Sequence, residues 1–166
     1  MTATVLSPNR SSRGGVAIDA IVLHDTRGRT AASALSWFSS SQSGVSSHYR
    51  IDRDGTVTLV VPEDEKAWHA GDSVLFGRPD VNRFSIGIEL VQERDSDGYP
   101  PAQLAMLADL SADCCRRHRI PLNRMVGHEH IAPGRKTDPG GDLDFYSLLL
   151  RIAMLIGPGS SRPASS

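Results

Sequence analysis

The sequence has little cysteine, little lysine and no long apolar run. Its two cysteines, Cys114 and Cys115, are adjacent within a helical pattern, which suits neither a disulfide between them nor a pair of metal ligands. Reduced cysteines favour a reducing compartment. No apolar stretch approaches the roughly 20 residues that span a bilayer, and the amino terminus lacks the apolar core of a secretory signal. The sequence therefore predicts a cytoplasmic protein with no membrane partner.

The sequence also lacks an excess of charge of either sign, since 18 basic and 19 acidic residues give a formal net charge of −1. Proteins that bind nucleic acid usually have a strongly basic surface, so nucleic acid is not an expected partner. The chain has no HExxH, GxSxG or GxxxxGK[ST] motif. These absences argue against a zincin, a serine hydrolase with a nucleophile elbow and a P-loop nucleotide-binding protein.

The length of 166 residues fits one compact domain. Residues 1–16 and the tail 157–166 are rich in serine, proline and glycine, so we expect both ends to be flexible. The domain between them spans residues 17–156. Its patterns predict strands and helices in alternation, namely a strand at 17–24, a helix after Thr30, a hairpin at 47–61, a strand at 84–91 and helices at 101–119 and 143–156.

Two of the predicted strands carry polar residues at positions that could border a functional site. The apolar strand at 17–24 ends in His24. The strand at 84–91 alternates isoleucine and leucine with Ser85, Gly87 and Glu89, so one face is apolar and the other is small around a carboxylate. We expect the second face to border the functional site.

Segment 126–144 is dense in glycine, proline, histidine and aspartate, and it is too long for an ordinary connection, which is typical of a functional loop. A catalytic zinc takes three protein ligands of the histidine, carboxylate or cysteine type. His24, His128 and Asp138 could supply that set. His130, two residues beyond His128, is a rival ligand.

Lysine is rare in this chain, which has only Lys66 and Lys136 among its 18 basic residues. Lys136 stands two residues before Asp138. An ammonium group is a compact point charge suited to one developing oxyanion, whereas a guanidinium suits planar anions. Taken alone, the presence of a lysine beside Asp138 is explained equally well by codon usage.

Five blocks of the sequence together resemble the type 2 N-acetylmuramoyl-L-alanine amidases, which include wall-recycling enzymes and phage lysozyme-type amidases and are related to the peptidoglycan recognition proteins. The resemblance runs from about residue 17 to 150. The blocks are the strand ending in His24, SHYRIDRDGTV at 47–57, AWHAG at 67–71, NRFSIGIELV at 82–91 and GHEHIAPGRKTDPGG at 127–141.

The resemblance implies a single α/β domain with a mixed central β-sheet flanked by helices. It also implies that Zn²⁺ is held by His24, His128 and Asp138, and it argues against His130 as a ligand. By the same likeness Glu89 matches the catalytic carboxylate and Lys136 matches the residue that assists it. The expected reaction is hydrolysis of the amide bond between N-acetylmuramic acid and L-alanine.

Two further residues are expected to bind the peptidoglycan or muropeptide substrate. His69 matches a position that lines the substrate cleft. In the phage lysozyme branch a tyrosine directly precedes the histidine of the hairpin strand, but here Ser47 precedes His48. This difference brings the chain nearer to the recycling branch, and Tyr49 is then expected to face the cleft.

Several alternatives stay open at the level of sequence. A non-catalytic muropeptide-binding module of the same fold is the main one, although such modules have lost a zinc ligand and this chain has all three. A structural zinc domain would require four ligands, with cysteines that the 127–141 block lacks. A phage endolysin released at lysis is an alternative to a cytoplasmic enzyme. The sequence leaves open the oligomeric state and the choice between polymer and small fragments.

Overall fold

The computed structural model describes residues 3–26, 28, 30–93 and 98–157. At its centre is a six-stranded sheet. In spatial order the strands are β1 (Ala3–Thr4), β5 (Val57–Leu59), β4 (Tyr49–Ile51), β9 (Ser85–Leu90), β3 (Ala20–Asp25) and β10 (Met125–Gly127). Only β4 and β5 pair antiparallel, as the predicted hairpin, and all other neighbours are parallel. The sheet is therefore mixed, as expected.

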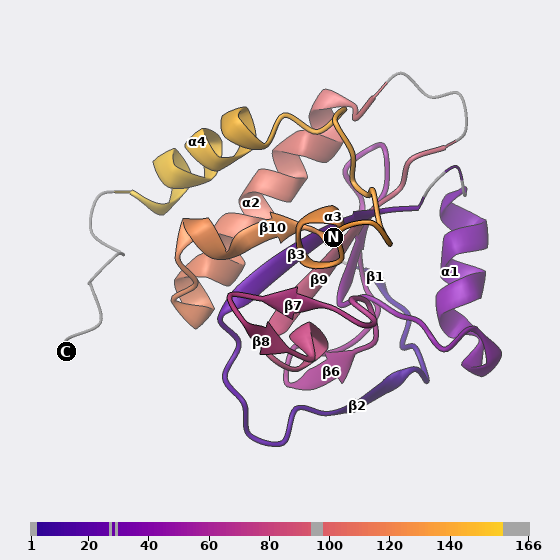
Figure 1. The fold of residues 1–166 in the computed structure, drawn as a ribbon. Helices are drawn as coiled ribbons and strands as arrows, with labels where there is room; N and C mark the ends of the chain where they lie inside the picture. The colour runs from indigo at the N-terminus through magenta and orange to yellow at the C-terminus, as the bar shows by residue number, and fades with distance from the viewer. Residues whose placement is uncertain (1–2, 27, 29, 94–97, 158–166) are drawn as a thin grey trace.

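Helices and two small sheets surround this sheet (Figure 1). The α-helices are α1 (Ala31–Ser39), α2 (Pro101–His118), α3 (His128–Ile131) and α4 (Phe145–Ile156). The short 3-10 helices are η1 (Ser41–Ser43), η2 (Val81–Arg83) and η3 (Leu122–Arg124). The small antiparallel sheets pair β2 (Arg10–Ser12) with β6 (Glu65–Ala67) and β7 (Val74–Leu75) with β8 (Arg78–Pro79).

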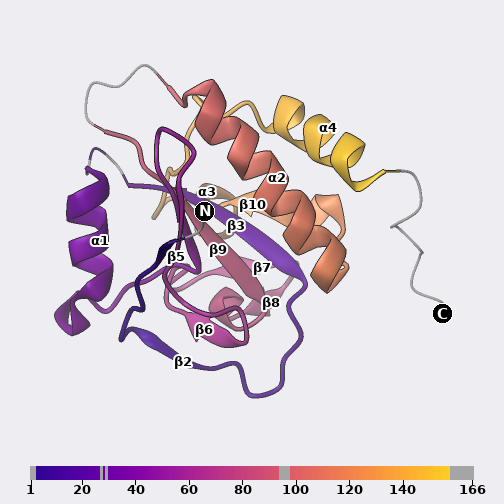
Figure 2. The same ribbon diagram turned by 180° about the vertical axis from the view of Figure 1, so that it is seen from behind.

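The two faces of the central sheet have different roles. Ile86, Ile88 and Leu90 of β9 belong to the main core, which also contains buried residues of α2 and α4. In Figures 1 and 2, α4 lies alongside α2, and α1 stands apart from both. The alternate residues of β9 face the other way, as the sequence predicted. That second face carries the polar groups.

Helices α1 and α2 begin where the sequence indicated, and α4 begins at Phe145, two residues after the predicted start. Thr30 caps α1 by accepting a hydrogen bond from the backbone N–H of Ser33. Pro101 occupies the first turn of α2, where its missing N–H costs nothing. Asp144 caps α4 through the backbone N–H of Ser147. No helix in the described part of the chain is both long and apolar enough to cross a membrane.

The amino-terminal segment differs from the flexible end that the sequence predicted. Strand β1 joins the edge of the central sheet and β2 pairs with β6. Three polar side chains of the segment, Ser7, Asn9 and Arg13, are buried. Their hydrogen bonds to main-chain carbonyls explain why a serine-rich stretch can pack against the domain. Of the tail predicted at 157–166, residues 158–166 lie outside the described residues.

Candidate metal centre and active site

The candidate site lies on the polar face of the sheet, at the carboxyl ends of β3 and β9. His24 and Glu89 are direct partners in the register of these parallel strands, so their side chains leave the same face next to each other. A pocket opens above them. Its walls include His24, His69, Glu89, His128, Lys136 and Asp138. The fold thus gathers six of the eight candidate residues named from the sequence, and Tyr49 and His130 are not among them.

Three of these side chains converge on one point. His24 Nδ1 lies 3.0 Å from His128 Nδ1 and 3.3 Å from Asp138 Oδ2, and His128 Nδ1 lies 3.0 Å from Asp138 Oδ2. All three residues are buried. They come from the end of β3, the start of α3 and the loop after α3. Their convergence confirms that strand 20–25 and the 127–141 block meet in space.

The spacing and the chemistry of these atoms fit a zinc ion. Ligand atoms roughly 2.0–2.1 Å from a tetrahedral zinc are about 3.3 Å apart, close to the separations observed. His128 Nε2 lies 3.1 Å from the carbonyl oxygen of Ala70, which can only accept a hydrogen bond. Nε2 therefore has a proton, which leaves Nδ1 as the only nitrogen of this ring that can offer a lone pair to a metal. This lone pair faces a carboxylate and a second imidazole, an arrangement that a cation stabilises.

Burial keeps His24 ready to act as a ligand. Removal from water lowers the pKa of His24 to about 4; the hydrogen bond to Asp138 partly opposes this effect, and the neighbouring His128 adds to it. The imidazole is therefore neutral near pH 7, and metal binding does not have to displace a proton from it.

Glu89 and Lys136 line the same pocket without belonging to the convergent cluster. Glu89 is half-buried, next to His24 on the neighbouring strand. Lys136 lies in the loop after α3, two residues before Asp138, and its backbone N–H donates to the carbonyl of Ala132. A carboxylate and an ammonium thus border the convergent point.

His69 also reaches the pocket, but both of its ring nitrogens are engaged. Nδ1 lies 3.0 Å from His24 Nε2, and Nε2 lies 3.2 Å from the hydroxyl of Ser85. The residue is only 9% exposed. Its ring contacts are with His24, a member of the convergent cluster, and with Ser85.

Tyr49 is not brought to the pocket, contrary to expectation. It pairs with Ile88 of β9, so its side chain leaves the apolar face of the sheet. There it packs against the main core, and its hydroxyl donates to Glu63 Oε1 at 2.7 Å. The alternation of β4 places His48 and Arg50 on the site's side of the sheet and Tyr49 on the other.

His130 stays outside the cluster, in agreement with the resemblance. Its Nδ1 accepts a hydrogen bond of 2.8 Å from the backbone N–H of Gly127, at the start of α3. Its ring packs edge-on against Phe145. The rival ligand is therefore occupied in capping a short helix.

The sequence did not single out several residues that shape the site. Asn82 accepts hydrogen bonds from the backbone N–H groups of His69 and Ala70. Trp37, Phe38 and Val45, from α1 and the segment after it, form an apolar wall of the pocket. Asn82 belongs to the NRFSIGIELV block, but its role depends on a loop 13 residues earlier in the chain, which no local pattern reveals.

Two imidazoles and a carboxylate that converge beside a glutamate and a lysine can hold one metal ion. A family model described as N-acetylmuramoyl-L-alanine amidase matches residues 14–141. The chain belongs to this family, in its type 2 branch.

Relatives in this family include 1,6-anhydro-N-acetylmuramyl-L-alanine amidase AmpD of Citrobacter freundii. It is 43% identical over 118 residues, which cover 71% of this chain and 60% of that protein. The N-acetylmuramoyl-L-alanine amidase AmiD of Escherichia coli is 40% identical over 111 residues, covering 58% of this chain and 40% of that one. The chain thus spans about 60% or less of these relatives.

Solved structures agree with this placement. A crystal structure of a selenomethionine derivative of AmpD has a TM-score of 0.82 at 32% identity and covers 91% of this chain and 93% of its own. A complex of AmiD from E. coli with anhydro-N-acetylmuramic acid-L-Ala-D-γ-Glu-L-Lys has a TM-score of 0.75 at 33% identity and covers 85% of this chain and 58% of its own. The expected fold, a mixed sheet flanked by helices, is confirmed.

Proposed function

We propose that this chain is a zinc-dependent N-acetylmuramoyl-L-alanine amidase that hydrolyses the bond between N-acetylmuramic acid and L-alanine. The observation that carries the proposal is the convergence of His24 Nδ1, His128 Nδ1 and Asp138 Oδ2 within 3.0–3.3 Å of one another. Three protein ligands leave a fourth position of a tetrahedral ion for catalysis, whereas a structural site closes with four.

His24, His128 and Asp138 would hold the metal. When bound, zinc supplies Lewis-acid chemistry, because it lowers the pKa of water toward about 7 and polarises a carbonyl group. Glu89 takes the proton from the attacking water and passes it to the leaving amine of L-alanine, which is general acid–base catalysis. The ammonium of Lys136 faces the negative charge that develops on the carbonyl oxygen.

The proposed substrates are muropeptides that contain an anhydro sugar. The name of the AmpD relatives specifies the 1,6-anhydro form, and the AmiD complex holds an anhydro-muramoyl tripeptide. The pocket of this chain combines the polar groups above with the apolar wall of Trp37, Phe38 and Val45. Such a wall suits the ring face of a sugar or a short aliphatic side chain, while the polar groups face the amide.

The second candidate is a muropeptide-binding module without catalysis. Such a module needs the pocket but not the complete set of ligands and the adjacent carboxylate. All of these groups are present and line one pocket here, which favours the enzyme.

The test is to measure release of L-alanine-terminated peptide from an anhydro-muramoyl tripeptide by the zinc-loaded protein. The same sample is measured after chelation and again after zinc is restored. We expect cleavage that stops on chelation and returns with zinc. Binding of the tripeptide without cleavage in the zinc-loaded sample would support the binding module instead.

A further inference from the structure

A loop outside the ligand set contacts the outward nitrogens of both metal-binding histidines. This loop, His69–Ala70, follows β6. The His69 ring lies against His24, and the Ala70 carbonyl lies against His128. A histidine ligand can bind a metal through Nδ1 only if its proton is on Nε2, so whatever faces Nε2 selects the tautomer.

For His24, the tautomer follows from a chain of hydrogen bonds that starts at a carbonyl. The hydroxyl of Ser85 lies 2.6 Å from the carbonyl oxygen of Val81 and must donate to it. Ser85 Oγ then accepts from His69 Nε2, at 3.2 Å. A neutral imidazole has one donor and one acceptor, so His69 Nδ1 accepts from His24 Nε2. This series of hydrogen bonds places the proton of His24 on Nε2 and leaves its lone pair at Nδ1, toward Asp138.

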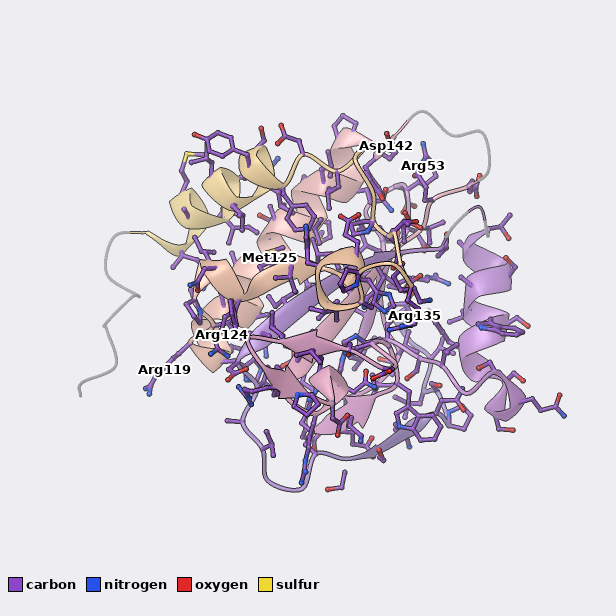
Figure 3. All side chains as sticks on the ribbon, in the orientation of Figure 1. Arg53, Arg119, Arg124, Met125, Arg135 and Asp142 are labelled. Carbon is purple, nitrogen blue, oxygen red and sulfur yellow. The ribbon has the colours of Figure 1, made fainter. Side chains whose placement is uncertain are left out.

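For His128, the Ala70 carbonyl alone selects the tautomer that has its proton on Nε2. It accepts from His128 Nε2 at 3.1 Å and also from the guanidinium of Arg135 at 2.8 Å. Arg135, which Figure 3 labels, reaches from the loop after α3 back to this carbonyl. The two metal-binding histidines therefore share one support.

Two features hold this support in place. The side-chain oxygen of Asn82 accepts from the backbone N–H groups of both His69 and Ala70, at 2.9 and 2.7 Å. Gly87 of β9 lets the His69 ring lie directly on the strand, because a Cβ there would stand 2.5 Å from His69 Cγ. Any larger residue at this position would displace the ring from His24.

We propose that His69 is a positioning residue that fixes His24 in its metal-binding tautomer, while Ala70, clamped by Asn82, does the same for His128. The inference rests on the zinc site of the proposed function. It replaces the substrate-binding role that the sequence suggested for His69.

The first measurement is zinc affinity, by competition with a chromophoric chelator. Loss of a supporting group beyond the ligands typically costs 10–100-fold in metal affinity. We expect a loss of that size in His69→Leu and Gly87→Ala. The zinc affinity of His69→Asn should stay within about threefold of that of the wild type. The side-chain oxygen of asparagine can take the place of Nδ1 and accept the hydrogen bond from His24. The control is His118→Leu on α2, whose ring contacts Glu63 and should leave zinc affinity unchanged.

The second measurement needs no variant, so it stands even if His69→Leu fails to fold. Long-range ¹H–¹⁵N spectra of the zinc-loaded protein should show His69 neutral and protonated at Nε2. Protonation at Nδ1 would overturn the proposal, since His69 could then not accept from His24. Wild-type affinity in His69→Leu together with a raised KM would also overturn it and make His69 a substrate contact. If the wild-type protein itself bound no zinc, the proposed function would fail as well.

Discussion

At the scale of single residues, the proposed function gives separate roles to the convergent cluster, which would hold the metal, and to Glu89, which would act on the substrate. Glu89 stands next to His24 in strand register but outside the cluster of ligand atoms. Proton transfer by a positioned side chain typically contributes about 10²–10⁴-fold to a rate. Metal binding and proton transfer can therefore be removed independently.

Glu89→Gln keeps the shape of the side chain and removes its ability to take a proton. We expect kcat to fall by at least about 100-fold while zinc affinity stays within a factor of about three. Both are measured on the same purified protein. Glu65→Gln on β6, whose carboxylate pairs with Arg10 away from the pocket, is the matched control and should retain activity. A Glu89→Gln enzyme with near-normal kcat would remove Glu89 from the mechanism.

The two histidines of the GHEH sequence should behave oppositely. His128→Ala removes a ligand atom of the cluster, and we expect zinc binding to fall below detection in equilibrium dialysis. His130→Ala should bind zinc as the wild type does, because His130 caps Gly127 instead. Its expected cost is about 1 kcal/mol of unfolding free energy, as for other helix caps. Loss of zinc from His130→Ala would contradict the assignment of ligands.

At the scale of elements, the amino-terminal segment contributes to the site although it does not enter the pocket. The buried guanidinium of Arg13 donates to the main-chain carbonyls of Glu63, Asn82, Arg83 and Ser85. Two of these residues, Asn82 and Ser85, supply the contacts that support His69. Through Arg13, the amino-terminal segment thus holds the turn between β8 and β9 in place.

Arg13→Met should be strongly destabilising, because it removes the partner of four carbonyls, each worth about 1 kcal/mol. We expect a loss of about 3 kcal/mol or more in urea unfolding. Arg119→Met is the matched control, since Arg119 is exposed and extends away from the fold in Figure 3. Its effect should stay within about 0.5 kcal/mol. Equal stabilities for the two variants would show that the segment contributes little.

Elements with a long periodic pattern were predictable from sequence, and elements decided by distant contacts were not. The apolar alternation of β9 and the spacing of leucines in α2 appear directly in the chain. β1 and β2 have two and three residues, and their partners lie more than 50 residues away. The convergent set of His24, His128 and Asp138 could be named from the sequence because its residues end a strand and lie in one dense block. The orientation of Tyr49 was missed because strand pairing, and not the residue type, decides it.

At the scale of the whole molecule, the sheet separates the pocket from an ion-pair cluster on the other side. Glu63 accepts hydrogen bonds from Tyr49 and contacts Arg117 and His118 of α2. Burial alone would raise the pKa of Glu63, but these donors outweigh it and lower the pKa from 4.5 to about 2. This cluster connects the β5–β6 turn to α2.

The stability of the protein should therefore depend on Glu63 in acid. Because the folded state holds this proton more weakly, the contribution is complete above pH 4.5 and is lost as the pH falls from about 4.5 toward 2. The shift corresponds to roughly 3 kcal/mol at neutral pH. Glu63→Gln should be less stable at pH 7 and should have a shallower decline over that window, measured by chemical denaturation at each pH. An unchanged decline would assign the acid sensitivity to other groups.

Mass spectrometry of the products formed from a defined anhydro-muramoyl tripeptide tests the proposed amide cleavage most directly. We predict free anhydro-N-acetylmuramic acid and a peptide with an unblocked L-alanine amino terminus, formed by the zinc-loaded protein and not by Glu89→Gln. Cleavage at a bond within the peptide, or an intact tripeptide bound to the zinc-loaded protein, would contradict the account.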